Sequence, residues 1–103
     1  MRRRYILAPE AALDFVQIWR YIKSNADIEM ADRFESVVRE KFLYLAKFPG
    51  GGHWRKDLTT ERVKFLPIYS YLIVYRPETN PLQIVAILHG RRDLEQLLLT
   101  RLE

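Results

Sequence analysis

Residues 10–48 read EAALDFVQIWRYIKSNADIEMADRFESVVREKFLYLAKF, and the class of fold follows from this stretch. Apolar side chains recur in it at every third or fourth position, which is the spacing of an amphipathic helix. The few residues around Asp27 interrupt the pattern, and Asp27 itself can cap a second helix. The stretch therefore predicts an antiparallel helical hairpin with one apolar face, formed by Ala11, Phe15, Ile18, Ile22, Ala31, Phe34, Val38, Phe42 and Leu45.

Before the hairpin, residues 3–9 (RRYILAP) contain tyrosine and isoleucine and end in a proline. This composition predicts a short β-strand. Pro9 suits the first turn of the following helix, where its missing N–H group costs nothing.

After the hairpin, residues 49–61 (PGGGHWRKDLTTE) cannot sustain a helix, and beyond them the apolar period changes to two. Three strands are predicted at 62–67, 69–76 and 82–89, and their short connections indicate an antiparallel meander. Strict alternation in the last strand places Leu82, Ile84, Ala86 and Leu88 on one face, and Gln83, Val85, Ile87 and His89 on the other. Both faces are largely apolar, so we expect this strand to be central.

The C-terminal residues predict a short helix capped by Asp93, with Leu94, Leu97, Leu98 and Leu102 on its apolar side. The whole chain, residues 1–103, is therefore expected to form a single α+β domain in the order β-α-α-β-β-β-α. Its antiparallel sheet is packed by the N-terminal helical hairpin, and the short helix follows at the C-terminus.

Composition narrows the classes of function. The chain has no cysteine, a net charge of +4 and 49% hydrophobic residues, and its sequence pI is about 9.6. We expect a globular cytoplasmic protein with an acidic partner, without a membrane segment or a disulfide framework. No histidine or carboxylate pair has metal-ligand spacing, so we expect no metal and no cofactor.

Four segments together resemble the RelE/ParE superfamily, the toxins of bacterial type II toxin–antitoxin systems, and specifically its ParE branch. They are APEAALDFVQIWRYI (8–22), ADRFESVVREKFLYLAKFPGGGHWRKDL (31–58), VKFLPIYSYLIVYR (63–76) and IVAILHGRRDL (84–94). The resemblance runs from about Ile6 to Leu98. The chain departs from the branch at Ala8, where a capping Ser or Thr is usual, and at Leu13 and Val16, where polar residues are usual.

The resemblance implies a toxin that binds DNA gyrase and stops replication without chemistry of its own. It also implies neutralisation by a cognate antitoxin whose disordered C-terminal segment folds over the toxin, and a dimer or a toxin–antitoxin hetero-oligomer is compatible with it. Leu13, Val16 and Trp19 make the first helix apolar on more than one face, so they either widen the core or form an interface. We expect partner contacts at Leu13, Val16, Trp19, Arg55, Arg91, Arg92, Leu94, Leu97 and Leu98.

Two other functions stay open. A RelE-like, ribosome-dependent mRNA endonuclease would need a base, an acid and cations, and its candidates are Arg62, Lys64, Arg76 and His89. The third reading is a degenerate toxin that retains only antitoxin binding. His89 ends an apolar strand and precedes a glycine turn, so we favour a structural role for it over a catalytic one.

Overall fold

The computed structural model describes residues 4–102; Arg3, the first residue of the predicted N-terminal strand, lies outside this range. The elements are β1 (Tyr5–Leu7), α1 (Pro9–Asn25), α2 (Ile28–Lys47), a short 3₁₀ turn η1 (Pro49–Gly51), β2 (Lys64–Ile68), β3 (Tyr71–Arg76), β4 (Leu82–His89) and α3 (Leu94–Arg101). The predicted α+β class and order of elements are confirmed, with η1 added after the hairpin.

The helix ends follow from local chemistry. Pro9 occupies the first turn of α1, and Ala8 before it supplies no side-chain cap. The Asp27 side chain accepts a hydrogen bond from the Met30 N–H at 2.8 Å, which caps α2. Asp93 accepts one from the Gln96 N–H at 3.3 Å at the start of α3. Both capping predictions are therefore confirmed.

The four strands form one sheet in the order β1-β4-β3-β2. Strands β2, β3 and β4 make the predicted antiparallel meander. Strand β1 adds a parallel pair on the far side of β4, with Tyr5 opposite Leu82 and Leu7 opposite Ile84. The sheet is thus mixed, and not antiparallel throughout as predicted, because β1 pairs in parallel with β4. Strand β4 is central as predicted, because a strand lies along each of its edges.

One prediction about β4 is wrong. Ile84 pairs with Tyr75 while Ala86 pairs with Val74, so Val85 is an extra residue in a β-bulge. The bulge reverses the alternation that follows it. Leu82, Ile84 and Ile87 belong to the core cluster that includes the helical hairpin, whereas Ala86 and Leu88 belong to the opposite cluster, together with Val85 itself.

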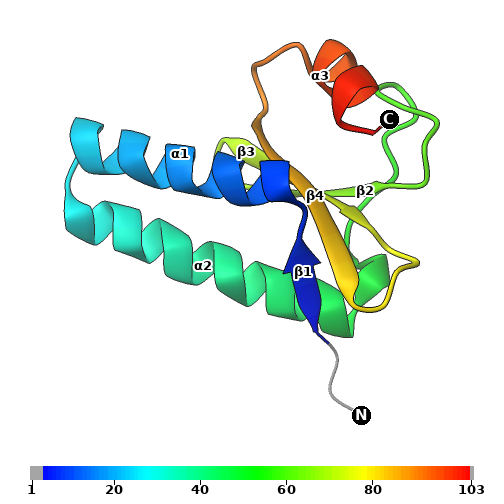
Figure 1. Ribbon diagram of the computed structural model, residues 1–103, viewed down its shortest axis with the longest axis horizontal. Helices are drawn as coiled ribbons and strands as arrows, with labels where there is room; N and C mark the ends of the chain where they lie inside the picture. The colour runs from blue at the N-terminus through cyan, green and yellow to red at the C-terminus, as the bar shows by residue number, and fades with distance from the viewer. Residues whose placement is uncertain (1–3, 103) are drawn as a thin grey trace.

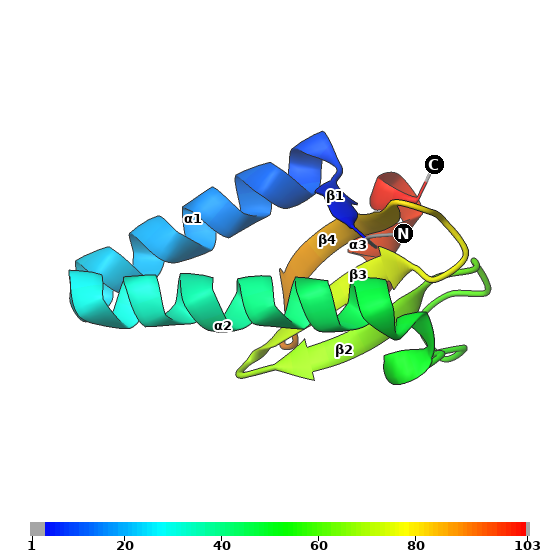
Figure 2. The same ribbon diagram turned by 90° about the horizontal axis from the view of Figure 1, so that it is seen from below.

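The sheet separates two layers (Figures 1 and 2). The hairpin of α1 and α2 covers one face, and α3 lies on the other side. The connected ends of the two long helices extend beyond the sheet. The main core lies between hairpin and sheet and contains buried Phe15, Phe34, Phe42, Ile73 and Tyr75. A second cluster lies under α3 and contains buried Phe65, Val74, Leu88, Leu94 and Leu98.

Tyr75 ties the glycine-rich loop to the core. Its ring is fully buried, and its hydroxyl accepts a hydrogen bond from the Gly52 N–H at 2.8 Å and donates one to the Pro49 carbonyl at 2.7 Å. A Cβ at position 52 would lie 2.6 Å from that hydroxyl oxygen. Glycine is therefore required there, because the backbone must approach the phenol closely.

Candidate functional site

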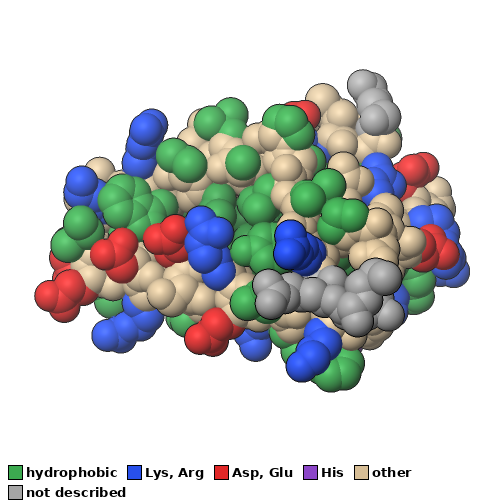
Figure 3. All heavy atoms as spheres, turned by 60° about the horizontal axis from the view of Figure 1, so that its bottom comes forward, with side chains coloured by type: hydrophobic (Ala, Val, Ile, Leu, Met, Phe, Trp, Pro, Cys, Tyr) green, Lys and Arg blue, Asp and Glu red, His purple; other side chains and the backbone are tan. Residues whose placement is uncertain are grey.

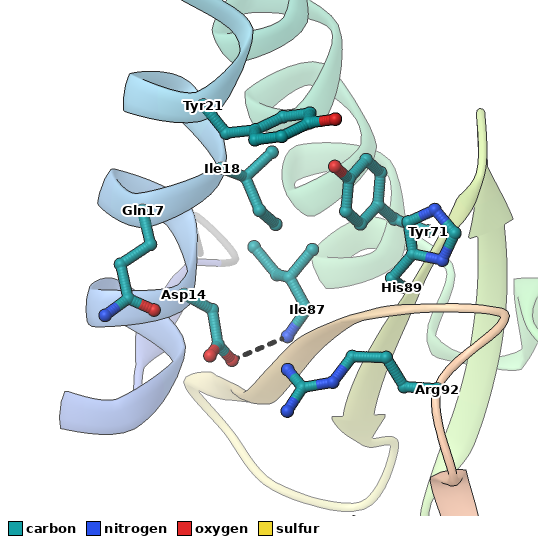
Figure 4. A pocket seen from close by; sticks show the side chains of 8 residues that line it. All are labelled: Asp14, Gln17, Ile18, Tyr21, Tyr71, Ile87, His89 and Arg92. Carbon is teal, nitrogen blue, oxygen red and sulfur yellow. Dashed lines mark hydrogen bonds between the residues drawn. The ribbon is translucent and has the colours of Figure 1, made fainter. Parts of the chain in front are cut away.

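A cleft of about 300 Å³ opens where α1 crosses the end of β4 (Figure 4). We call it the His89 cleft. Helix α1 supplies one wall, β3 and β4 supply the floor, and Arg92 extends into it from the loop after β4. The cleft combines apolar and polar groups, with lining residues Asp14, Gln17, Ile18, Tyr21, Tyr71, Ile87, His89 and Arg92.

His89 is held by the turn that it begins. Its Nδ1 accepts a hydrogen bond from the Arg91 N–H at 3.1 Å, and its carbonyl accepts one from the Arg92 N–H at 3.1 Å. The Gly90 N–H donates to the Ser70 carbonyl at 2.8 Å, which fixes the turn against β3. The Nδ1 contact places the proton of a neutral imidazole on Nε2. These contacts give His89 a structural role in the turn.

Tyr71 packs beside His89, with the ring centroids 5.2 Å apart and the rings nearly perpendicular. Burial raises the pKa of the Tyr71 phenol, and the nearby Tyr21 raises it further. The phenol therefore remains protonated at neutral pH and can donate a hydrogen bond into the cleft.

Asp14 is the buried carboxylate of the cleft, and the sequence predictions missed it. Its two oxygens accept hydrogen bonds from Arg101 Nη2 at 2.7 Å and Nη1 at 2.8 Å. A third bond comes from the Ile87 N–H at 3.1 Å, where β1 has ended and leaves the edge of β4 open. The sequence did contain a pattern that indicates its burial: Asp14 lies three residues after Ala11 and four before Ile18, and is therefore on the inward side of the helix.

The four candidates for RNA cleavage do not form one site. Arg62 and Lys64 both lie over the Trp54 ring, with Arg62 Cζ 4.6 Å and Lys64 Nζ 4.9 Å from its centroid. Arg76 lies nearby, since its neighbour Tyr75 pairs with Lys64. His89, however, pairs with Tyr71 at the opposite end of β3, five residues from Arg76. At about 3.4 Å per residue the separation along the strand is about 17 Å.

Arg62 also has a carboxylate partner. Two of its nitrogens donate to Glu78 at 3.1 and 3.2 Å, and this contact lowers the pKa of the Glu78 carboxyl. The cation is therefore partly engaged before any phosphate could bind it.

The outer side of α1 carries the predicted apolar residues, which we call the α1 stripe: Leu13, Val16 and Trp19. Leu13 is 55% exposed and Val16 45% exposed, so these two side chains do not widen the core. The Trp19 Nε1–H donates to Asp32 of α2 at 3.1 Å. Hydrophobic side chains gather over α1 and in the hollow between the two long helices (Figure 3), where Val16 and Trp19 line a pocket of about 170 Å³.

The remaining predicted contact residues divide by exposure. Leu94 and Leu98 are buried on the side of α3 that faces the sheet, and Leu97 packs against the same cluster. They anchor the helix and present little surface to a partner. Arg55 is held by Asp57 through bonds of 2.8 and 2.9 Å. Arg91 and Arg92 are exposed, and neither forms an ion pair within residues 4–102.

Two negative findings apply to the part of the chain that the structure describes. No three histidine or acidic side chains there are grouped as metal ligands would be. No helix in residues 4–102 combines the length and hydropathy that crossing a membrane requires.

Comparison with known proteins gives the family. Residues 5–94 match the family model described as the ParE toxin of the type II toxin–antitoxin system parDE. The chain belongs to the ParE toxin family. The match spans most of the chain and includes the hairpin, all four strands and the first residue of α3, which confirms the resemblance in the sequence.

Among solved structures, a chain of the chromosomal ParDE system from P. aeruginosa is similar to this ParE-family chain, with a TM-score of 0.71 and 18% identity. The alignment covers 85% of this chain and 96% of the other. At that identity the likeness concerns the fold. No curated protein matches the sequence.

Proposed function

We propose that this ParE-family toxin inhibits DNA gyrase in the cytoplasm and catalyses no reaction itself. Membership of the family supports the gyrase target. The position of His89 supports the proposal that the protein catalyses no reaction. Its Nδ1 is engaged by the backbone, and it lies at the opposite end of β3 from Arg76 and Lys64. A general base must reach the group that the cations hold, and this imidazole does not.

The cognate antitoxin is proposed to cover the α1 stripe. Exposed large apolar side chains on a helix usually mark an interface, and a disordered segment that folds on binding can bury such a strip. The neighbouring Arg39 guanidinium lies 5.2 Å from the Phe15 ring and pairs with Glu35, which lines the same pocket, so the charges beside the stripe are balanced. A segment with apolar side chains on one face fits this surface.

The proposed target is tested by adding the purified toxin to a gyrase supercoiling reaction and, separately, to a translating extract. Loss of supercoiling or trapped DNA breaks, with intact message, would support the proposal. Cleaved message would instead support the RelE-like endonuclease. Inactivity in both assays would favour a degenerate toxin that only binds its antitoxin.

The proposed antitoxin surface is tested with Val16→Glu. This variant should still inhibit growth but should no longer be neutralised by the co-expressed antitoxin, because the charge would be buried at the interface. Leu43→Glu is the matched control, since Leu43 is 57% exposed on the other long helix. If both variants are neutralised like the parent, the antitoxin does not cover the α1 stripe.

A further inference from the structure

A second pocket, of about 270 Å³, lies next to the His89 cleft and shares Tyr71 with it. Its walls are mostly apolar side chains, from Ile22, Met30, Phe34 and Tyr69. With Tyr21, which lines the cleft near Tyr71 (Figure 4), three tyrosines surround the two pockets. We call Tyr21, Tyr69 and Tyr71 the tyrosine surface. It draws on α1, β3 and the turn before β3.

Tyr69 is held in a conformation that tyrosine rarely adopts. It is the first residue of the turn between β2 and β3, and its φ is 53°. A two-residue hairpin loop with positive φ there usually has glycine at this position. Tyr69 is nevertheless 66% exposed, and its ring touches Phe34 at a centroid distance of 6.0 Å. Strain that presents an aromatic ring to solvent points to a binding role.

Apart from Asp14, the charged side chains that line the two pockets are arginines. Arg33 lines the apolar pocket and Arg92 lines the cleft, and neither forms an ion pair within residues 4–102. Asp14 is the carboxylate of the cleft, but both of its oxygens bind Arg101. The positive charge of Arg33 and Arg92 is therefore not balanced by an ion pair within residues 4–102, and it favours binding of an anion at the two pockets.

We propose that the tyrosine surface binds single-stranded nucleic acid without sequence preference. A base would stack in the apolar pocket against Tyr69 and Tyr71, while Arg33 and Arg92 contact the phosphates on either side. Flat apolar rings next to unpaired guanidinium groups are the two elements that such sites combine. An acidic peptide would satisfy the cations, but its carboxylate side chains have no flat face to stack on the rings. This binding does not depend on the gyrase target.

The test uses fluorescence anisotropy with fluorescein-labelled oligothymidylate of about 12 nucleotides, a length that covers a typical single-strand site. The parent protein should bind it more tightly than a duplex of equal length. Tyr69→Ala should weaken binding by about 5- to 150-fold, which is the measured range for one lost base stack. Tyr44→Ala is the control, because Tyr44 is 44% exposed at the far end of α2 and should leave the affinity unchanged.

Charge and folding are separated by further variants. Arg92→Ala should lower the slope of log affinity against log salt by about 0.7, the value for one phosphate contact on a single strand, and Lys56→Ala should not. Tyr69→Gly relieves the turn, so it should fold at least as well as the parent and still lose binding. Tyr69→Phe should keep it.

Three results would overturn the proposal. The first is no anisotropy change at any soluble protein concentration. The second is equal weakening by Tyr69→Ala and the Tyr44→Ala control. The third is a Tyr69→Ala protein that binds the probe as tightly as the parent does and releases all of it when a polyglutamate peptide is added. This result would identify the surface as a site for an acidic protein.

Discussion

Removal of the Asp14 carboxylate should destabilise the protein strongly. The side chains of Asp14 and Arg101 are only 9% and 14% exposed, and they meet through two short bonds. Asp14→Ala would leave the Arg101 cation without its main partner and the Ile87 N–H without an acceptor. Breaking a buried pair costs about 3–5 kcal/mol. Because Glu10 still contacts Arg101 Nε at 3.0 Å, we expect the lower end, about 3 kcal/mol.

The assay is urea unfolding followed by circular dichroism. Asp14→Asn keeps an oxygen for the Ile87 N–H, so it should cost about 1 kcal/mol less than Asp14→Ala. Arg101→Met combined with Asp14→Ala should recover part of the loss, with a coupling energy of about 1.5–3 kcal/mol. Glu35→Ala breaks only the exposed pair with Arg39 and should cost about 0.5 kcal/mol or less.

Two results would contradict the expected role of the Asp14–Arg101 ion pair. Asp14→Ala could cost as little as Glu35→Ala, which would mean that water compensates the lost partner. Alternatively, the double-mutant cycle could show no coupling, which would mean that Asp14 and Arg101 act independently and that the contact does not hold α3 to α1.

Three other variants test the core, the loop anchor and the turn. Phe34→Ala should cost about 3–5 kcal/mol in the same unfolding assay, because the ring is 4% exposed and lies among other rings; a cost below about 1 kcal/mol would place Phe34 at the surface. Tyr75→Phe should cost about 1–3 kcal/mol, because the Gly52 N–H loses its acceptor. Burial raises the pKa of the Tyr75 phenol, so its contribution to the free energy of unfolding is complete below the unfolded pKa of about 10 and is lost as the pH rises above that value. The free energy of unfolding of Tyr75→Phe should therefore fall less steeply with pH in the alkaline range, and an unchanged alkaline profile would contradict this. His89→Gln should retain growth inhibition in a protein that circular dichroism shows to be folded, because glutamine can still accept the hydrogen bond of the Arg91 N–H; loss of inhibition together with loss of message cleavage would favour the endonuclease.

The elements and their order were predictable because they depend on local patterns. Helical spacing located α1 and α2, and side-chain caps located the starts of α2 and α3. The parallel pairing of β1 was not predictable, because the helical hairpin and the first two strands of the meander separate β1 from β4 in the sequence. The bulge at Val85 was also invisible, since alternating and bulged strands have the same composition.

The candidate site was predictable only in part. His89, Arg91 and Arg92 follow one another in the sequence, so their proximity was expected. The contact between Asp14 and Arg101 spans 87 positions, and no local signal indicates which arginine a buried aspartate will meet. The positive φ of Tyr69 depends on its position in a short turn. The sequence analysis placed Tyr69 in the following strand instead, because tyrosine is typical of strands.

The position of β1 has a consequence for biosynthesis. The first strand made is completed only by the last one, since Tyr5 pairs with Leu82. These residues are 77 positions apart, and at 5–20 residues per second the ribosome needs about 4–15 s to add them. The helical hairpin can form during this interval, but the complete four-stranded sheet cannot. A chain cut short before β4 therefore cannot form the complete sheet, and the β1 edge stays unpaired until β4 has been made.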